Sequence, residues 1–200
     1  MRTMVKVWKN LYSSLGQIDP KCPLGNKVVK QTMRPSEYKR SADVIIEKFN
    51  PQDSILEIGC GFGGLALEIL KSASVKYTVV DNKIMLFQAK KFLGDKVEYI
   101  EAVKIETLQN RKFELFISHH CLSETPTEYR QYILENIIKN CQKISIRDLN
   151  DTSKPTSRMI EDGYEMIPLE IEEWVEKYFI IEKTKYRKHQ IAMYMGERRK

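Results

Sequence analysis

The sequence alternates between short apolar stretches and helical stretches from residue 54 to residue 148. Repeated strand–helix units form a parallel sheet with helices on both faces. Right-handed crossovers then bring the carboxyl ends of the strands to one edge of the sheet, where such folds bind their ligands. The strands are predicted at residues 54–59, 76–81, 96–102, 112–118 and 143–148.

The last 50 residues depart from this alternation. A helix, "LEIEEWVEKY", is followed by two strand-like runs, "FIIEKT" and "HQIAMYMG", around the basic turn "KYRK". A hairpin here adds an antiparallel ending to the sheet. The predicted fold class is therefore α/β: a Rossmann-like, doubly wound, mostly parallel seven-stranded sheet with an antiparallel C-terminal hairpin strand.

The N-terminal part is predicted to contribute a helical cap. Residues 1–35 form this cap segment, and residues 36–200 form the main domain, giving one globular domain overall. Trp8 and Tyr12 are candidate aromatic residues on the acceptor side, with core packing as the alternative. A helix begins near residue 36, and Tyr38 falls on its apolar stripe.

A glycine-rich turn follows the first predicted strand, in "SILEIGCGFGGLALEIL" (residues 54–70). Gly59, Gly61 and Gly64 satisfy the pattern G-x-G-x-x-G, and Asp81 lies 20 residues after Gly61 at the end of the second strand. An acid at that point accepts hydrogen bonds from ribose hydroxyls. A Walker-type phosphate loop is excluded because no Lys-Ser/Thr pair follows the glycines. A dinucleotide remains open at this point.

Glu57, two residues before Gly59, favours a different ligand. A carboxylate at the mouth of the turn repels a pyrophosphate and suits a cation. The stretch "LEIGCGFGG", the acid Asp81 and the seven-strand ending together resemble class I S-adenosylmethionine-dependent methyltransferases. The similarity spans roughly residues 36–196.

The resemblance implies a role for each residue that matches the family's motifs. The methionine part of S-adenosylmethionine would lie against the glycine turn, and Asp81 would hold the ribose hydroxyls. Asn82 and Lys83 would flank the ribose and adenine, Glu101 and Ala102 would lie near the adenine amine, and Ser118 would border the sulfonium. The turn residues implied are Glu57, Gly59, Cys60, Gly61 and Phe62.

The stretch "SHHCLSET" after the fourth strand is predicted to face the methyl acceptor. A hydroxyl is a poor nucleophile until a base removes its proton. His119, His120 and Glu124 are the proton-transfer types here, with His119 the preferred base and Glu124 able to orient a histidine or bind an acceptor hydroxyl. Structural packing of these side chains is the alternative. A divalent metal held by these groups and Asp148 is an alternative, but their spacing is no metal signature, so no metal is predicted.

Two longer stretches narrow the resemblance to the sugar O-methyltransferase family of bacteria. They are "TVVDNKIMLFQAKKFLG" and "FELFISHHCLSETPTEYRQYILENII". The chain departs from that family in having His119-His120 where an asparagine and an aromatic residue are expected, and in its short length. The resemblance implies methylation of a hydroxyl on a sugar or glycan precursor.

Composition bounds the remaining alternatives. The net charge is +6, which is compatible with RNA as a partner, although no Asp/Asn-Pro-Pro-aromatic loop typical of base methylation follows the fourth strand. A methyltransferase acting on RNA or on a small-molecule amine, an NAD(P)-dependent oxidoreductase and a non-enzymatic scaffold stay open. Four cysteines without CxxC pairing, no signal peptide and no membrane span predict a cytoplasmic protein. The oligomeric state is not predicted.

Overall fold

The computed structural model describes residues 35–122, 125, 127–149, 169–186 and 191–200. The predicted N-terminal cap with Trp8 and Tyr12 lies outside these residues, apart from Pro35, and so does Glu124. Within the described part of the chain, no helix is long and apolar enough to cross a membrane.

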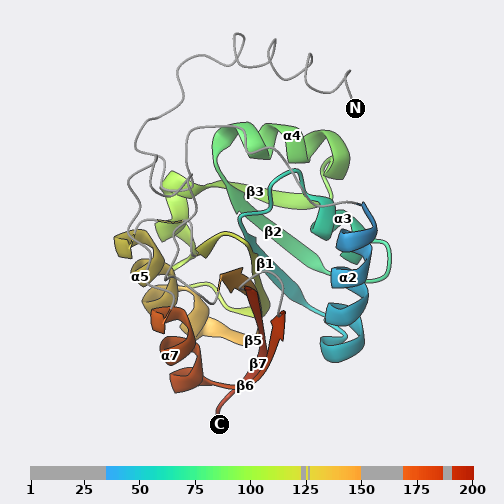
Figure 1. The fold of residues 1–200 in the computed structure, drawn as a ribbon. Coiled ribbons are helices and arrows are strands. Elements are labelled where there is room, and N and C mark those ends of the chain that lie inside the picture. The colour runs from blue at the N-terminus through green and yellow to red at the C-terminus, as the bar shows by residue number, and fades with distance from the viewer. Residues whose placement is uncertain (1–34, 123–124, 126, 150–168, 187–190) are drawn as a thin grey trace.

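All the described strands belong to one seven-stranded sheet (Figure 1) with the order β3-β2-β1-β4-β5-β7-β6. The five strands from β3 to β5 pair in parallel, and β7 pairs antiparallel with both β5 and β6. This topology confirms the predicted fold class. The strands are β1 (Ser54–Ile58), β2 (Lys76–Asp81), β3 (Val97–Glu101), β4 (Phe113–His119), β5 (Cys141–Leu149), β6 (Phe179–Tyr186) and β7 (Ile191–Arg198).

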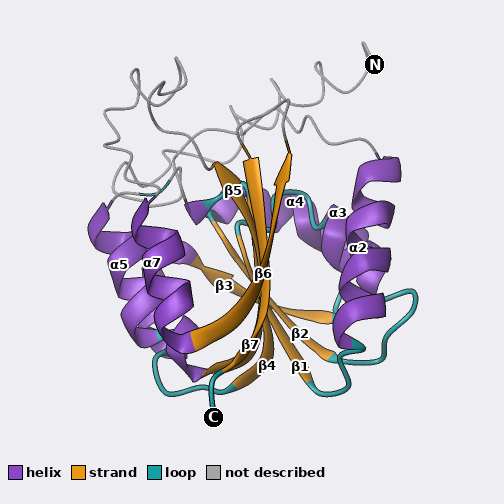
Figure 2. Cartoon of the chain, turned by 60° about the horizontal axis from the view of Figure 1, so that its bottom comes forward, coloured by secondary structure: helices purple, strands orange, loops and turns teal. Residues whose placement is uncertain are grey.

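Helices cover both faces of the sheet, as Figure 2 shows. One face carries α2 (Pro35–Phe49), α3 (Gly64–Ile69) and α4 (Lys83–Leu93). The other carries α5 (Thr127–Asn136), α7 (Leu169–Tyr178) and the 3-10 helix η1 (Ala102–Leu108). A short 3-10 turn, η3 (Ile138–Asn140), leads into β5.

Side-chain alternation along the strands divides the interior into two cores. In β1, Leu56 and Ile58 belong to the core beneath α5 and α7. Ile55 belongs to the core beneath α2, α3 and α4, and Glu57, two positions further on, points to that same side. One buried carboxylate is thereby placed among apolar residues on the α2 side of the sheet.

The helix after β2 begins and ends as the sequence predicts. The Asn82 side chain accepts hydrogen bonds from the backbone nitrogens of Ile84 (3.1 Å) and Met85 (2.9 Å). Such a cap satisfies amide groups that have no partner within the helix. Gly94 ends the helix with φ of 59°. The cap holds α4 directly behind the carboxyl end of β2.

The strand order reverses between β1 and β4. The chain moves outward from β1 to β2 and β3, and then returns to place β4 on the other side of β1. In open α/β sheets the crevice at such a reversal is the usual ligand site. The glycine turn after β1 and the histidines at the end of β4 both lie at this point.

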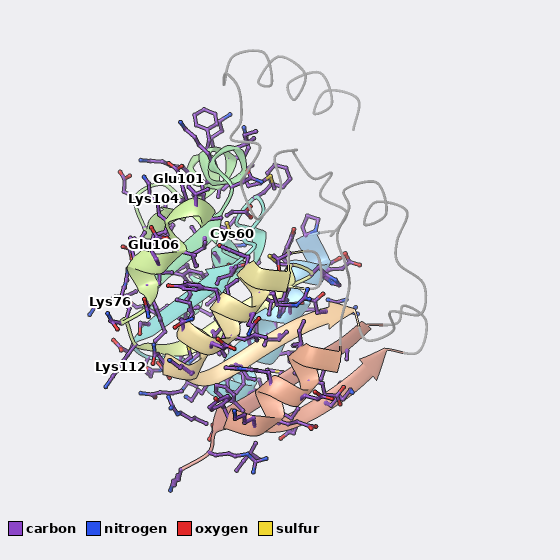
Figure 3. All side chains as sticks on the ribbon, turned by 90° about the vertical axis from the view of Figure 1, so that its left-hand side faces the viewer. Cys60, Lys76, Glu101, Lys104, Glu106 and Lys112 are labelled. Carbon is purple, nitrogen blue, oxygen red and sulfur yellow. The ribbon has the colours of Figure 1, made fainter. Side chains whose placement is uncertain are left out.

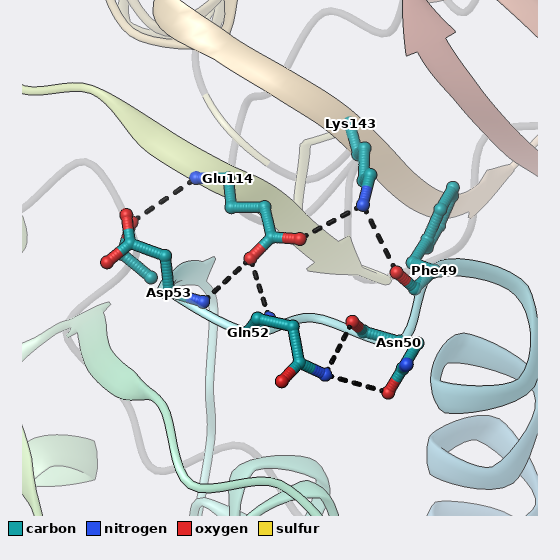
Figure 4. Close-up of polar contacts among 7 residues, drawn as sticks. Phe49, Asn50, Gln52, Asp53, Glu114 and Lys143 are labelled. Carbon is teal, nitrogen blue, oxygen red and sulfur yellow. Dashed lines mark hydrogen bonds and ion pairs between the residues drawn. The ribbon is translucent and has the colours of Figure 1, made fainter.

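A polar network closes the opposite end of the sheet (Figure 4). The Glu114 carboxylate accepts hydrogen bonds from the backbone nitrogens of Gln52 and Asp53, both at 2.8 Å. The Lys143 ammonium donates to Glu114 at 3.0 Å and to the carbonyl of Phe49 at 3.1 Å. Glu114 thus joins the end of α2, the entry into β1 and the starts of β4 and β5.

These bonds govern the ionisation of Glu114. Burial acts to raise the pKa of its carboxyl, but the hydrogen bonds from Lys143 and the two backbone amides outweigh it, so the pKa is lowered from 4.5. An acid with a lowered folded-state pKa adds stability above its unfolded pKa and loses it as the pH falls.

We predict that Glu114→Gln lowers the free energy of unfolding by about 1.5–3 kcal/mol at pH 7, because charge-assisted bonds at a partly buried site are lost. Urea unfolding measures this loss, which should shrink as the pH falls below about 4.5. Asp43→Asn, in the exposed Lys39–Asp43 pair on α2, is the control and should leave the urea midpoint unchanged. An equal loss at pH 3 and pH 7 would contradict this account of Glu114.

Candidate functional site

The turn between β1 and α3 requires glycine for its backbone shape. Gly59, Gly61 and Gly63 have φ of 80°, 56° and 76°, in the left-handed region that side chains disfavour. At Gly59 space is also limiting, because a Cβ there would lie 2.4 Å from the Cβ of Cys121. The first glycine therefore lets the loop after β4 pack directly on the loop after β1.

Asp81 at the end of β2 is tied to this turn. Its carboxylate accepts hydrogen bonds from the backbone nitrogens of Gly61 (2.8 Å) and Asn82 (2.7 Å). Only 6% of the residue is exposed. Burial raises the pKa of Asp81 to about 7, although both backbone donors act to lower it.

Glu57 lies deeper on the same face of the sheet. It is 3% exposed, and its carboxylate accepts a hydrogen bond from the Tyr77 hydroxyl at 2.8 Å. Burial raises the pKa of Glu57 to about 8, the Tyr77 bond acts in the opposite direction, and the charge of Asp81 adds to the rise. The two acids repel one another as anions.

The site is therefore acidic, and its two carboxylates lack a cationic side chain as a partner. Within the described part of the chain, no lysine, arginine or histidine forms an ion pair with Glu57 or Asp81. A carboxylate has about four lone-pair sites, so both acids can accept further hydrogen bonds. A ligand with a positive charge and ribose hydroxyls would complement these acids, and S-adenosylmethionine has both.

His119 ends β4 on the face that carries Glu57 and Asp81. Its Nε2 lies 3.2 Å from the Ser145 hydroxyl on β5, and its buried Nδ1 has no hydrogen-bond partner among the described residues. Burial lowers the pKa of His119 to about 3, and the charges of His120 and Arg147 add to the effect. The imidazole is neutral near pH 7.

His120 adopts a left-handed backbone conformation with φ of 57°, and its amide donates to the carbonyl of Arg147 at 2.6 Å. Burial and the Arg147 charge lower its pKa to about 4. A neutral imidazole can take up a proton, but a low pKa weakens it as a base. The base role of His119 or His120 stays a prediction.

Ser118 faces the opposite side of the sheet from His119, because successive residues of a strand alternate. It is fully buried and lies beside Ile146 of β5. Its hydroxyl has no hydrogen-bond partner among the described residues. Its predicted role beside the sulfonium stays a prediction.

The structure brings Glu101 beside Asp81, since the two residues are register partners on β3 and β2. The Glu101 carboxylate is partly exposed and lies 3.8 Å from the ammonium of Lys104. Figure 3 shows these two side chains together, to one side of Cys60. Ala102, the first residue of η1, is fully buried, and its carbonyl accepts a bond from the Tyr129 hydroxyl at 3.0 Å.

The remaining predicted cofactor residues surround the turn. Cys60 is buried, Phe62 is half-buried, and Asn82 is buried as the cap of α4. Lys83 is exposed at the first position of that helix. Among the described residues, no three His, Cys, Asp or Glu side chains gather to hold a metal ion, and the cysteines described there are buried.

The sequence reasoning missed three polar residues of this site. Tyr77 was open to prediction, because it shares a strand face with Asp81 four residues later. Arg147 at the end of β5 likewise shares the face of Ser145. The helical spacing places Tyr38 on an apolar stripe, and nothing in that spacing indicates where its hydroxyl lies.

We predict that Gly59→Ala destabilises the fold by about 1–3 kcal/mol from its left-handed backbone alone. The collision with Cys121 adds to this loss and moves the loop after β4. Gly94→Ala is the control, because it also has a positive φ but nothing within 4 Å of a Cβ. Urea unfolding measures stability, and accessibility of the Cys121 thiol to a reagent measures the loop. Unchanged thiol accessibility in Gly59→Ala would contradict the proposed packing.

The raised pKa values of the two acids predict a pH dependence of the ligand-free protein. The folded state holds protons that the unfolded state releases above about pH 4.5, so stability falls as the pH rises toward about 8. Glu57→Gln removes one of these acids. The melting temperature of the wild type relative to this variant should therefore fall from pH 5 to pH 8.5. A constant difference across that range would show that Glu57 is not strained by burial.

Comparisons with known proteins bear on the fold. No protein-family model matches the sequence, and no curated protein matches it significantly. Solved structures do match. An O-methyltransferase family protein from Burkholderia thailandensis superposes with a TM-score of 0.65 at 12% identity, over 82% of this chain and 57% of that chain. The chain thus spans little more than half of that protein.

Two other matches were solved with S-adenosylhomocysteine. The N-methyltransferase NodS from Bradyrhizobium japonicum WM9 has a TM-score of 0.65 at 11% identity, over 96% of this chain and 98% of that chain. The plantazolicin methyltransferase BpumL has a TM-score of 0.59 at 18% identity, over 81% and 82% of the two chains. The chain has the Rossmann-like fold of S-adenosylmethionine-dependent methyltransferases.

Proposed function

We propose that this chain is an S-adenosylmethionine-dependent methyltransferase that methylates a hydroxyl of a sugar or glycan precursor. One observation carries the cofactor part of the proposal. Two buried carboxylates, Glu57 and Asp81, flank a glycine turn at the reversal point of a methyltransferase-like sheet, and neither has a cationic side chain as an ion-pair partner among the described residues. A cationic nucleoside ligand would offset the repulsion between them.

Each acid has a part in holding such a ligand. Asp81 would accept hydrogen bonds from the ribose hydroxyls while the amides of Gly61 and Asn82 keep its carboxylate in place. Glu57, oriented by Tyr77, would supply negative charge beneath the methionine part. When bound, S-adenosylmethionine supplies an electrophilic methyl group on a positively charged sulfur. The protein's task is to align this methyl with a nucleophile and to exclude water.

The acceptor side is proposed at the ends of β4 and β5. His119, His120 and the half-buried Arg147 lie there, and both imidazoles are neutral near pH 7. A neutral imidazole can hydrogen-bond a sugar hydroxyl and accept its proton as the carbon–oxygen bond forms. Resemblance to sugar O-methyltransferases in this stretch supports the hydroxyl acceptor.

A second candidate, methylation of an amine, is favoured by one comparison. The N-methyltransferase NodS matches this chain over nearly its whole length, whereas the O-methyltransferase family protein extends well beyond it. An amine nucleophile needs a base only when it is protonated. The two candidates therefore differ in how strongly turnover depends on His119.

The cofactor proposal predicts that S-adenosylhomocysteine binds the wild type and raises its melting temperature. Asp81→Asn should weaken binding by about tenfold to a hundredfold, because hydrogen bonds to a charged group are lost. Gly61→Arg should abolish it by filling the turn. Asp95→Asn, an exposed acid before β3, is the control. Calorimetry gives the affinities, and wild-type affinity in Asp81→Asn would contradict the assigned site.

The acceptor proposal predicts that nucleotide sugars, and not small amines or RNA, drive formation of S-adenosylhomocysteine from S-adenosylmethionine. If His119 is the base, His119→Ala lowers kcat by about 100-fold to 10,000-fold. The wild-type kcat at saturating S-adenosylmethionine should then stay flat from pH 5 to pH 7, because the pKa of His119 is about 3. Mass spectrometry of the products identifies the acceptor. Turnover of amines or RNA alone would overturn the sugar assignment.

A further inference from the structure

Tyr38, in the first turns of α2, packs against the start of α3. A Cβ built on Gly64 would lie 2.7 Å from Cε2 and 2.9 Å from Cζ of the Tyr38 ring. These distances are shorter than real Cβ contacts, so only glycine at position 64 leaves room for the ring where it is. Gly64, the last glycine of the G-x-G-x-x-G pattern, therefore allows the Tyr38 ring of α2 to pack against the glycine turn.

The hydroxyl of Tyr38 is buried and has no hydrogen-bond partner among the described residues. Buried hydroxyls are normally hydrogen-bonded, and each exception calls for an explanation. Burial raises the pKa of Tyr38, and the charge of Glu57 is the next largest cause. The hydroxyl therefore lies in the electrostatic reach of the buried acid at the glycine turn.

Tyr38 and Glu57 together present complementary chemistry. A phenol donates a hydrogen bond, whereas an ionised carboxylate only accepts them. The amino-acid end of the methyl donor carries both an ammonium, which suits a carboxylate, and a carboxylate, which needs a donor. No described lysine or arginine forms an ion pair with Glu57. The Tyr38 hydroxyl is thus a neutral donor within the electrostatic reach of an acid that lacks a cationic partner.

We propose that Tyr38 binds the amino-acid end of the methyl donor, its hydroxyl donating to the ligand's carboxylate while Glu57 faces the ammonium. The inference rests on the proposed methyl-donor site and adds a binding residue contributed by α2. It also assigns Gly64 a role, which is to leave the space in which the Tyr38 ring reaches the turn.

Tyr38→Phe tests the proposal because it keeps the ring and removes the hydroxyl. Calorimetry compares S-adenosylhomocysteine with 5′-methylthioadenosine, which lacks the amino-acid end. We expect the affinity for S-adenosylhomocysteine to fall at least about fivefold, and that for 5′-methylthioadenosine to stay unchanged. The melting temperature of the ligand-free protein should not fall, since no described residue bonds the hydroxyl.

Two further variants make the test specific. Gly64→Ala displaces the ring and should reduce the affinity for S-adenosylhomocysteine more than that for 5′-methylthioadenosine. Tyr132→Phe loses a hydroxyl contact with Gln109 on the opposite face and should change neither affinity. Unchanged binding of S-adenosylhomocysteine to Tyr38→Phe, or an equal loss for both ligands, would overturn the inference. If the wild type binds neither ligand, the proposed function itself fails.

Discussion

Two buried carboxylates on neighbouring strands organise the functional end of this protein. Glu57 and Asp81 sit on one face of the sheet, and each is held by neutral donors: a tyrosine hydroxyl for Glu57 and two backbone amides for Asp81. Neutral donors orient a carboxylate without cancelling its charge, and burial outweighs their effect, so the pKa values of both acids rise toward neutrality. In the ligand-free protein, protonation offsets the cost of this arrangement, and we propose that a bound cation offsets it instead.

Largely buried acids lie at both ends of the sheet, and Glu114 differs from Glu57 and Asp81 in having a cationic partner among the described residues. At the amino ends of the strands, Glu114 has Lys143 beside it, and its pKa is lowered. At the carboxyl ends, the acids have no such ion-pair partner within the described residues. The ion pair of Glu114 and Lys143 thus contributes stability at one end of the sheet. At the other end, Glu57 and Asp81 could form an ion pair with a cationic ligand. Natural proteins accept such local strain at functional sites.

Much of the fold follows from local patterns in the sequence. The strand at residues 76–81 and the helix at 169–178 are predicted with the bounds that the structure shows, and the Asn82 cap and Gly94 stop are confirmed. Glu57 and Asp81 were also predictable, because one lies two residues before the glycine turn and the other ends the second strand. Ser118 and His119 show the limit of motif-based prediction. The motif places both residues beside the reacting methyl group, but adjacent residues of a strand point to opposite faces of the sheet. The Tyr38 hydroxyl was beyond prediction because its position depends on how α2 packs on Gly64, a long-range contact.

If Glu57 and Asp81 bind a cationic methyl donor, the protons that they hold in the ligand-free protein must be released on binding. Calorimetry of S-adenosylmethionine binding at pH 7, in buffers of different ionisation enthalpy, counts the protons exchanged. Because a cation favours the ionised forms of Glu57 and Asp81, the account predicts that the wild type releases protons and that a Glu57→Gln/Asp81→Asn variant releases fewer. Binding without proton release, or with the same release in both proteins, would contradict it.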